Sequence, residues 1–185
     1  LSAFIVDKGT DGLVLNPEEK KMGINGSSTR QVFFNDVKIP KDNQLSQREN
    51  GFKIALNILN VGRIKLAAAT LGSTKEYIDA SVRYANERYQ FGRPISKYGA
   101  IRYKLGEMGL RAYALESAVY RISQNIQDRI DDLDESGLDK GAATLKGIEE
   151  YAAECAMMKV YGSEVLDYVA DEGVQIHGGM GYSAE

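Results

Sequence analysis

The strongest constraint on the fold is a regular spacing of apolar residues in the second half of the chain. Between residues 101 and 126 these residues recur at alternating separations of four and three, at Ile101, Leu105, Met108, Ala112, Leu115, Val119, Ile122 and Ile126. Such spacing places them on one face of a long α-helix that packs nearly antiparallel to a neighbour. A similar stripe follows at Leu145, Ile148, Ala152, Cys155, Met158, Gly162, Val165 and Val169. The patterns predict a bundle of long helices.

We expect three helices, over residues 52–88, 99–133 and 138–175, each roughly 50 Å long at about 1.5 Å per residue. The sequence "FGRP" at 91–94 ends the first, because proline cannot continue a helix. The acidic, glycine-bearing "DDLDESG" ends the second.

The first 50 residues have a different pattern. Short β-like segments, "AFIVDK" and "RQVFFNDVKIP", are separated by turn-forming stretches such as "KGTDG" and "GINGSS". These strands are too few to close a stable sheet alone. The chain also opens directly on an apparent strand, "LSAFIVDKG", so we expect the natural N-terminus to lie upstream. The fold class is therefore mainly α, a helical bundle preceded by the last strands of a β-domain.

Composition excludes several classes of function. The 185 residues carry 23 basic and 26 acidic side chains, a net charge of −3, which is too weak a field to concentrate nucleic acid or anionic membrane. One cysteine, Cys155, and one histidine, His177, cannot form a disulfide or a zinc site. No apolar run approaches the roughly 18 to 20 residues of a membrane span. We expect a soluble protein in a reducing compartment with no metal site.

Polar residues interrupt the apolar stretch "ALNILNVGRIKLAAATLG" at 55–72. Arg63 must reach water, an intramolecular carboxylate or an anionic ligand, because a buried unpaired guanidinium is costly. Asn60 lies one turn earlier on the same face, so both side chains could address one ligand. Gly62 lowers helix propensity by about 1 kcal/mol relative to alanine, which indicates close approach of either a ligand or another helix.

Two further segments combine residues suited to a phosphate-bearing ligand. In "ERYQFGRPISKYG" at 87–99, Arg88, Gln90 and Phe91 stand where a helix gives way to a turn, and they could grip an aromatic phosphate ligand or simply cap the helix. In "GVQIHGGMGYSAE" at 173–185, the glycines could admit a pyrophosphate to main-chain N–H groups or cap the helix. The glycines follow a helix, so they are not a dinucleotide fingerprint of the strand-to-helix type. His177 and Cys155 are interpreted as packing residues.

In their order along the chain, these segments resemble the acyl-CoA dehydrogenase family. The similar blocks are "AFIVDKG", "EKKMGINGSSTRQVFFNDVKIPKDN", "GFKIALNILNVGRIKLAAATLG", "ANERYQFGRPI" and "VQIHGGMGY", which cover nearly the whole chain. The block around "EKKMGI" and that around "GFKIALNILNVGR" are most similar to the very-long-chain branch. The resemblance implies that residues 1–45 end a middle β-domain and that residues 46–185 form a truncated C-terminal helical domain.

The resemblance also implies roles for individual residues. It places Asn60, Val61, Gly62 and Arg63 at the acyl-CoA site, although many family members have Asp where Asn60 stands. It makes Arg88, Gln90 and Phe91, together with Gln175, Ile176, His177, Gly178 and Gly179, contacts of an FAD cofactor in the neighbouring subunit, and hence implies at least a homodimer. Many members carry a further flavin-contacting glutamine where this chain has Gly99.

The implied reaction is α,β-desaturation of long-chain fatty acyl-CoA in β-oxidation, with electrons passed to an electron-transfer flavoprotein. In the family a glutamate removes the α-proton while the β-hydride passes to the flavin. One of the two family positions for that base is Gly62 here, so we expect the base beyond Glu185, which is not itself the base. The fragment alone should be inactive. The alternatives are an oxidase or monooxygenase on the same fold, and a scaffold with no or dual activity. The resemblance implies the cytoplasm if the source is bacterial and the mitochondrial matrix side if it is eukaryotic.

Overall fold

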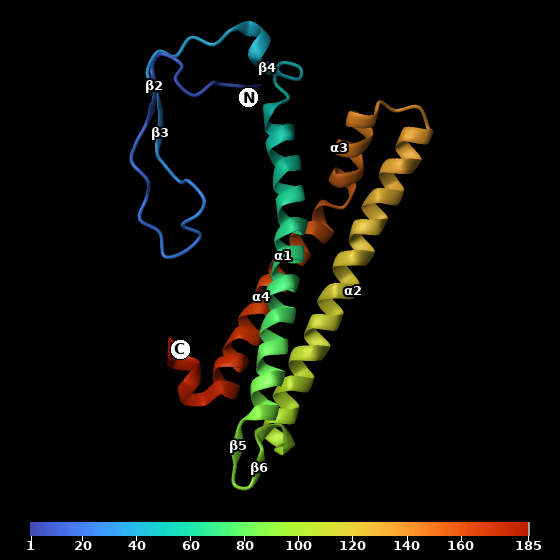
Figure 1. Cartoon of the computed structure of the whole chain (residues 1–185). Coiled ribbons are helices and arrows are strands. Elements are labelled where there is room, and N and C mark those ends of the chain that lie inside the picture. The colour runs from blue at the N-terminus through green and yellow to red at the C-terminus, as the bar shows by residue number, and fades with distance from the viewer. Residues whose placement is uncertain (185) are drawn as a thin grey trace. The chain divides into compact units, whose positions relative to one another are not determined.

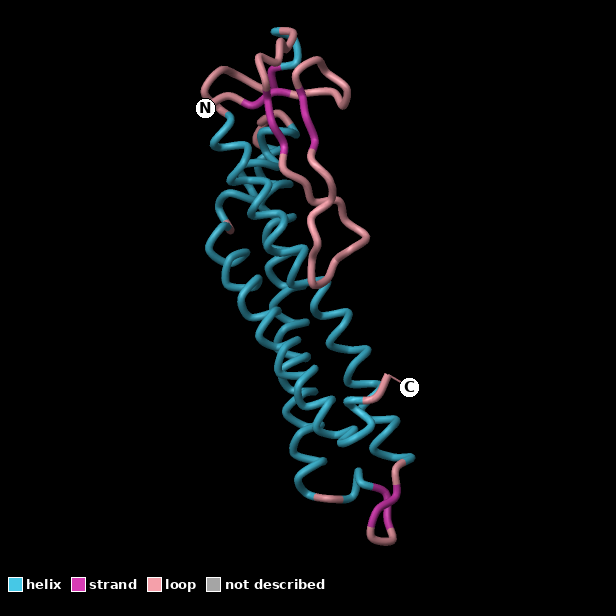
Figure 2. The backbone as a smooth tube through the Cα atoms, turned by 90° about the vertical axis from the view of Figure 1, so that its left-hand side faces the viewer, coloured by secondary structure: helices cyan, strands magenta, loops and turns pink. Residues whose placement is uncertain are grey.

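The computed structural model describes residues 1–184 and divides the chain into two compact units, Leu1–Leu56 and Asn57–Glu185. The order of the elements along the chain can be followed in Figure 1. Short strands occupy the first unit, and long helices dominate the second (Figure 2). The predicted change of structure near residue 50 falls where the long helix α1 (Gly51–Glu87) begins.

The first unit contains two antiparallel strand pairs. Strand β1 (Ala3–Phe4) pairs with β4 (Gln44–Leu45), which follows a short 3-10 helix, η1 (Lys41–Asn43). Strand β2 (Leu13–Leu15) pairs with β3 (Val32–Phe34). Two-stranded pairs have little stability of their own.

Glu18 organises the long connection between β2 and β3. Its carboxylate accepts hydrogen bonds from the Ser28 hydroxyl at 2.7 Å, the Thr29 backbone N–H at 3.0 Å and the Arg30 guanidinium at 2.7 Å. The Ser28 hydroxyl is the largest influence on the Glu18 pKa, followed by the Thr29 N–H and Arg30, and together they lower it to about 2. The ionised Glu18 carboxylate therefore links the part of the loop that follows β2 to the part that precedes β3.

The second unit is built on three long helices. Helix α1 runs antiparallel to α2 (Gly99–Glu135), to which it is joined by a hairpin of β5 (Tyr89–Gln90) and β6 (Arg93–Pro94) and by the 3-10 helix η2 (Ile95–Lys97). After the short α3 (Lys140–Glu150), helix α4 (Ala152–His177) runs back along α2, and η3 (Gly178–Tyr182) is the last element among residues 1–184. Ion pairs Lys75–Glu116 and Lys104–Glu172 join α2 to α1 and α4 respectively.

The core confirms the stripe predicted on α2. Met108, Ala112, Leu115, Val119, Ile122 and Ile126 are buried, and Ile101 and Leu105 are half-buried against them. Cys155 is fully buried in the same core, and this burial is the main reason why the pKa of its thiol is raised. A buried, protonated thiol is unreactive, which agrees with the predicted packing role.

The single helix predicted over residues 138–175 is instead two helices, α3 and α4, broken at Tyr151. Helix α3 packs closely on the end of α2. A Cβ added to Gly147 would lie only 2.6 Å from Ile130 Cγ1, so the approach requires glycine there. Arg129 on α2 also grips Glu150 on α3 through two hydrogen bonds of 2.6 and 3.1 Å. The break resets the helical register, so Leu145, predicted in the buried stripe, is 43% exposed.

Helix α1 corrects the expectation that no apolar run is long enough to span a membrane. A window of 18 residues within α1 has a mean hydropathy of 1.3, which is sufficient by length and composition alone. One such helix is weak evidence, because core helices of soluble proteins have the same character. Here α1 contributes Ala67 and Leu71 to the core of the bundle, and it also buries the polar side chains of Thr74 and Ser81.

Candidate functional site

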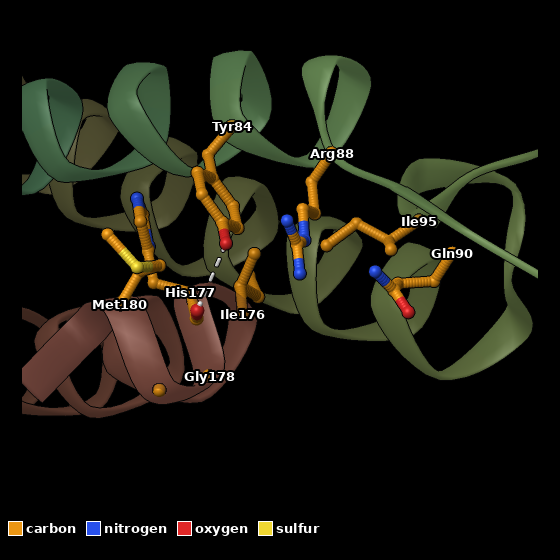
Figure 3. Close-up of a pocket in the computed structure, with 9 residues that line it drawn as sticks. Tyr84, Arg88, Gln90, Ile95, Ile176, His177, Gly178 and Met180 are labelled. Carbon is orange, nitrogen blue, oxygen red and sulfur yellow. Dashed lines mark hydrogen bonds between the residues drawn. The ribbon is translucent and has the colours of Figure 1, made fainter.

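A cavity of about 370 Å³ lies where the C-terminal end of α1 meets that of α4. Its lining comes from segments far apart in sequence, as Figure 3 shows, and consists of Tyr84, Arg88, Gln90, Ile95, Ile176, His177, Gly178, Gly179 and Met180. The structure thus brings the first phosphate-suited segment of the sequence together with the second. Six of the eight residues expected to contact a cofactor line this one cavity: Arg88, Gln90, Ile176, His177, Gly178 and Gly179.

Arg88 enters the cavity because α1 ends immediately before it. Its backbone N–H still donates to Tyr84 O at 2.9 Å, and its carbonyl accepts from the N–H of Ile95 at 2.8 Å, which closes the base of the hairpin. The side chain is exposed, and among residues 1–184 the structure gives it no hydrogen bond or ion pair. A guanidinium left free at a helix end is suited to an anionic ligand.

Phe91 does not line the cavity, because it stands at the tip of the β5–β6 hairpin. Its side chain is 92% exposed, and Phe91 and Gly92 have φ angles of 51° and 82°, as a tight two-residue hairpin turn requires. Positive φ is unfavourable for a bulky residue, so the turn holds the aromatic ring outward at an energetic cost. Tyr98 supports the hairpin: its hydroxyl donates to Gln90 O at 2.8 Å, and its ring lies 4.1 Å from the Arg93 guanidinium carbon.

The glycine segment ends α4 and turns the chain past the cavity. Gly178 has a φ of 58° and a ψ of −132°, a conformation open to glycine, and its N–H donates back to Val174 and Gln175 carbonyls. The helix-capping interpretation therefore accounts for the Gly178 N–H. Gln175 itself is exposed and lies outside the cavity lining.

The chemistry of the cavity fits a phosphate-bearing ligand. Its lining includes the Arg88 guanidinium and the Gln90 amide but none of the carboxylates of the described chain. A Cβ added to Gly178 or Gly179 would meet no atom within 4 Å, so the space in front of this backbone is open. An apolar floor with a few convergent polar groups is typical of a cofactor site.

The second set of predicted residues lies far away on α1. Arg63 Nη1 donates to the side-chain oxygen of Asn60 at 2.9 Å, and Asn60 is only 5% exposed. The intramolecular partner of Arg63 is therefore an amide on its own helix, whereas the sequence had suggested a carboxylate on a neighbouring one. Because an amide leaves the positive charge uncompensated, Arg63 keeps its capacity to bind an anion.

Gly62 beside Arg63 is exposed, and a Cβ there would meet nothing within 4 Å. Close packing between the described helices consequently does not explain this glycine, whereas both explanations were open from the sequence. Val61 next to it is half-buried. Arg63 and Arg88 are separated by roughly 37 Å along α1 at about 1.5 Å per residue. A single anionic group of a ligand therefore cannot contact both arginines.

The sequence model of the acyl-CoA dehydrogenase C-terminal domain matches residues 49–185. The chain belongs to the acyl-CoA dehydrogenase family. This match covers most of the chain and confirms both the family resemblance and the helical-bundle fold. It also confirms that the long helices belong to the C-terminal helical domain of such enzymes.

Individual acyl-CoA dehydrogenases resemble the chain over its whole length. A crystal structure of an acyl-CoA dehydrogenase complexed with FAD from Bacillus anthracis is 49% identical with a TM-score of 0.90, over 99% of this chain and 31% of that one. A probable acyl-CoA dehydrogenase of Bacillus subtilis is 48% identical over 100% of this chain and 31% of its own length. The human mitochondrial very-long-chain specific acyl-CoA dehydrogenase is 39% identical over 100% of this chain and 26% of its own. The chain thus spans less than a third of the length of these relatives.

Sequence reasoning missed three residues of the cavity in this acyl-CoA dehydrogenase domain, namely Tyr84, Ile95 and Met180. The signal for Tyr84 was its position one helical turn before Arg88, which places both on one face of α1. Glu185, interpreted as a glutamate other than the base, lies outside the described residues. Within residues 1–184, no three potential metal ligands cluster.

Proposed function

We propose that the chain is a part of an FAD-dependent acyl-CoA dehydrogenase that desaturates fatty acyl-CoA thioesters between the α and β carbons. We further propose that its substrates are long-chain, that it serves fatty acid β-oxidation, and that it passes electrons to an electron-transfer flavoprotein. The observation that carries the proposal is the cavity at the ends of α1 and α4, which is lined both by Arg88, without a side-chain partner among residues 1–184, and by an open glycine turn. The FAD-bound Bacillus anthracis relative, 49% identical, supports the same cofactor here.

The cavity residues would bind the diphosphate and adjoining part of FAD. Arg88 offers up to five N–H donors to phosphate oxygens, and the Gln90 amide adds a neutral donor. The apolar side chains of Ile95 and Ile176 would exclude water from one side of the ligand, which strengthens these polar interactions. When bound, FAD supplies the two-electron acceptor for the substrate hydride.

Arg63 and Asn60 would bind the anionic CoA portion of the substrate. Asn60 holds the Arg63 guanidinium through one hydrogen bond and leaves its other N–H groups available. Gly62, with open space in place of a side chain, would let the ligand approach the helix backbone. Since Gly62 occupies one of the two positions at which the family carries its base, we propose that the glutamate base follows residue 185.

The family resemblance suggests an oligomer, because the matching residues of acyl-CoA dehydrogenases contact the FAD of the neighbouring subunit. Arg63 and Arg88, roughly 37 Å apart along α1, would then contact different ligands. We therefore propose at least a homodimer, in which the cavity near Arg88 receives FAD from the neighbouring subunit. The outward-held Phe91 at the hairpin tip is consistent with a reach across that interface.

The visible spectrum of the full-length protein tests this function. We expect a flavin band that bleaches on anaerobic addition of palmitoyl-CoA and recovers with an electron-transfer flavoprotein as acceptor. Repeating the addition with butyryl-CoA and octanoyl-CoA measures the preference for chain length. A flavin that stays oxidised with every acyl-CoA would contradict the dehydrogenase reaction and favour another flavin reaction or a scaffold. Rapid reoxidation by oxygen alone would favour an oxidase.

A further inference from the structure

We propose that Tyr84 is a positioning residue that fixes the glycine turn of α4 opposite Arg88 and thereby holds the FAD cavity in its binding shape. This inference rests on the proposed function and adds a residue that belongs to neither of the predicted cofactor segments. Tyr84 lies on α1, half-buried, one helical turn before Arg88.

The Tyr84 side chain makes two contacts with His177, the last residue of α4. Its ring stacks on the imidazole with the centroids 4.3 Å apart and an interplanar angle of 25°. Its hydroxyl donates to the His177 carbonyl at 3.2 Å, the dashed line in Figure 3. Carbonyls in the last turn of a helix lack intrahelical donors, so this hydroxyl satisfies a group that the helix leaves free.

The imidazole is held from its other side as well. His177 Nδ1 lies 2.8 Å from the carbonyl oxygen of Gly173, which can only accept, so Nδ1 carries the hydrogen. The ring is thus fixed between its own helix and Tyr84. Gly178 follows directly, with its φ of 58°, and starts the turn whose backbone lines the cavity.

Tyr84 consequently connects the two walls of the cavity. Its backbone carbonyl accepts from the Arg88 N–H at 2.9 Å on one wall, and its side chain holds the end of α4 on the other. A guanidinium and a glycine turn can bind the same diphosphate well only when their separation is fixed before binding. The alternative is that Tyr84 only packs in the core. Its replacement would then lower the stability of the fold and leave the shape of the cavity unchanged.

Three variants of the full-length protein separate these interpretations. Tyr84→Phe keeps the stacking and removes the hydroxyl, whereas Tyr84→Leu removes both. Tyr113→Leu is the matched control, because Tyr113 lies on α2 with 73% exposure and does not line the cavity. The readouts are the FAD dissociation constant of the apoprotein, by quenching of flavin fluorescence, its melting temperature, and hydrogen exchange of the peptide covering Gly178 and Gly179.

We expect the FAD dissociation constant to rise about two- to tenfold in Tyr84→Phe, the range for loss of one neutral hydrogen bond, and further in Tyr84→Leu. Exchange over Gly178 and Gly179 should quicken in the same order, while Tyr84→Phe melts near the wild-type temperature. If Tyr84→Leu fails to fold, Tyr84→Phe alone decides the matter. In addition, Tyr84→Leu should add little to the effect of His177→Leu, because Tyr84 acts through His177.

Unchanged FAD affinity and exchange in Tyr84→Phe and Tyr84→Leu would overturn the positioning role, as would affinity losses equal to those of Tyr113→Leu. Failure of the proposed function looks different, because the wild-type apoprotein would then take up no FAD. In that case quickened exchange over Gly178 and Gly179 would still support the role of Tyr84 in holding the turn, and unchanged exchange would refute it.

Discussion

At the scale of single residues, the positions most informative about function are those whose residue type the surrounding helix and its packing do not explain. Gly62 weakens a helix without easing any contact between described residues, and the hydrogen bond that Arg63 makes among residues 1–184 is to the Asn60 amide. Packing of the described residues does not account for either residue, and binding of an anionic ligand on α1 is the role that we propose for both. Asn57, one turn before Asn60, is 3% exposed with a side-chain nitrogen that lacks a partner among residues 1–184, so the polar face extends further along the helix.

Replacing Arg63 tests the substrate role. In the full-length enzyme, Arg63→Ala should raise KM for acyl-CoA by about tenfold or more, as loss of a charged hydrogen bond implies, with kcat changed much less. Lys65→Ala is the control, since Lys65 is exposed on the same helix two residues further on. Steady-state kinetics with palmitoyl-CoA measure both. A KM equal to that of the control would remove Arg63 from the substrate site.

The Glu18 carboxylate gives a prediction about pH. Its pKa is lowered to about 2 in the folded state, so the stabilisation it provides is complete above the ordinary value of 4.5 and is lost as pH falls towards 2. The Thr29 amide, which donates to this carboxylate at 3.0 Å, reports the charge directly. With ¹⁵N-threonine labelling, we expect its NMR shift to stay constant from pH 7 to pH 4. A titration midpoint near 4.5 would show that the loop does not hold the carboxylate charged.

At the scale of elements, helices α1 and α4 approach each other closely at Gly162. A Cβ on Gly162 would lie 2.6 Å from Thr70 Oγ1 and 3.0 Å from Ala67 Cα. Thr70 also donates its hydroxyl to Ala67 O at 2.9 Å, which fixes the position of the oxygen that a Cβ on Gly162 would meet. Gly162 therefore sets the distance between the two helices that carry the cavity walls.

Substitution of Gly162 tests this packing. Gly162→Ala should lower stability by about 1–2 kcal/mol, because the strain of an added methyl group exceeds the roughly 1 kcal/mol gained in helix propensity. Gly106→Ala on α2 is the control. A Cβ there meets nothing within 4 Å, so this substitution should only gain helix propensity, without strain. Thermal unfolding followed by circular dichroism should give a lower midpoint for Gly162→Ala and an equal or higher one for Gly106→Ala. The reverse order would show that α1 and α4 pack less closely.

The sequence predicted the elements well where periodicity is long. The stripe on α2 predicted a buried face, and both ends of that helix fall within two residues of expectation. The break at Tyr151 was not predicted, and the contacts just before it, Gly147 on Ile130 and Arg129 with Glu150, join two different helices and cannot be read from local periodicity. Helix α1 was predicted over residues 52–88 and runs over Gly51–Glu87, but its apolar character was underestimated because polar residues interrupt it.

At the scale of the whole molecule, the helical unit carries two groups of candidate functional residues at separate positions along α1. Motif spacing predicted both groups, and the fold brings Arg88 and Gln90 to the glycine segment across the end of the bundle. Tyr84 could not be assigned from sequence, because its role depends on stacking with His177, which lies far along the chain. The sequence allowed Gly178 to be a helix C-cap, and the structure confirms this, because the Gly178 N–H donates to the Val174 and Gln175 carbonyls of α4.

The cavity near Arg88 is proposed to bind FAD, and the amount of flavin that purifies with the full-length protein is the sharpest test of this role. We compare the ratio of 450 nm to 280 nm absorbance for the wild type, Arg88→Ala and Arg83→Ala. Arg83 is an exposed arginine of the same helix that does not line the cavity. Loss of a charged phosphate contact should weaken FAD binding by about tenfold or more, so Arg88→Ala should purify with less flavin than the other two proteins. Equal flavin in all three would contradict the claim.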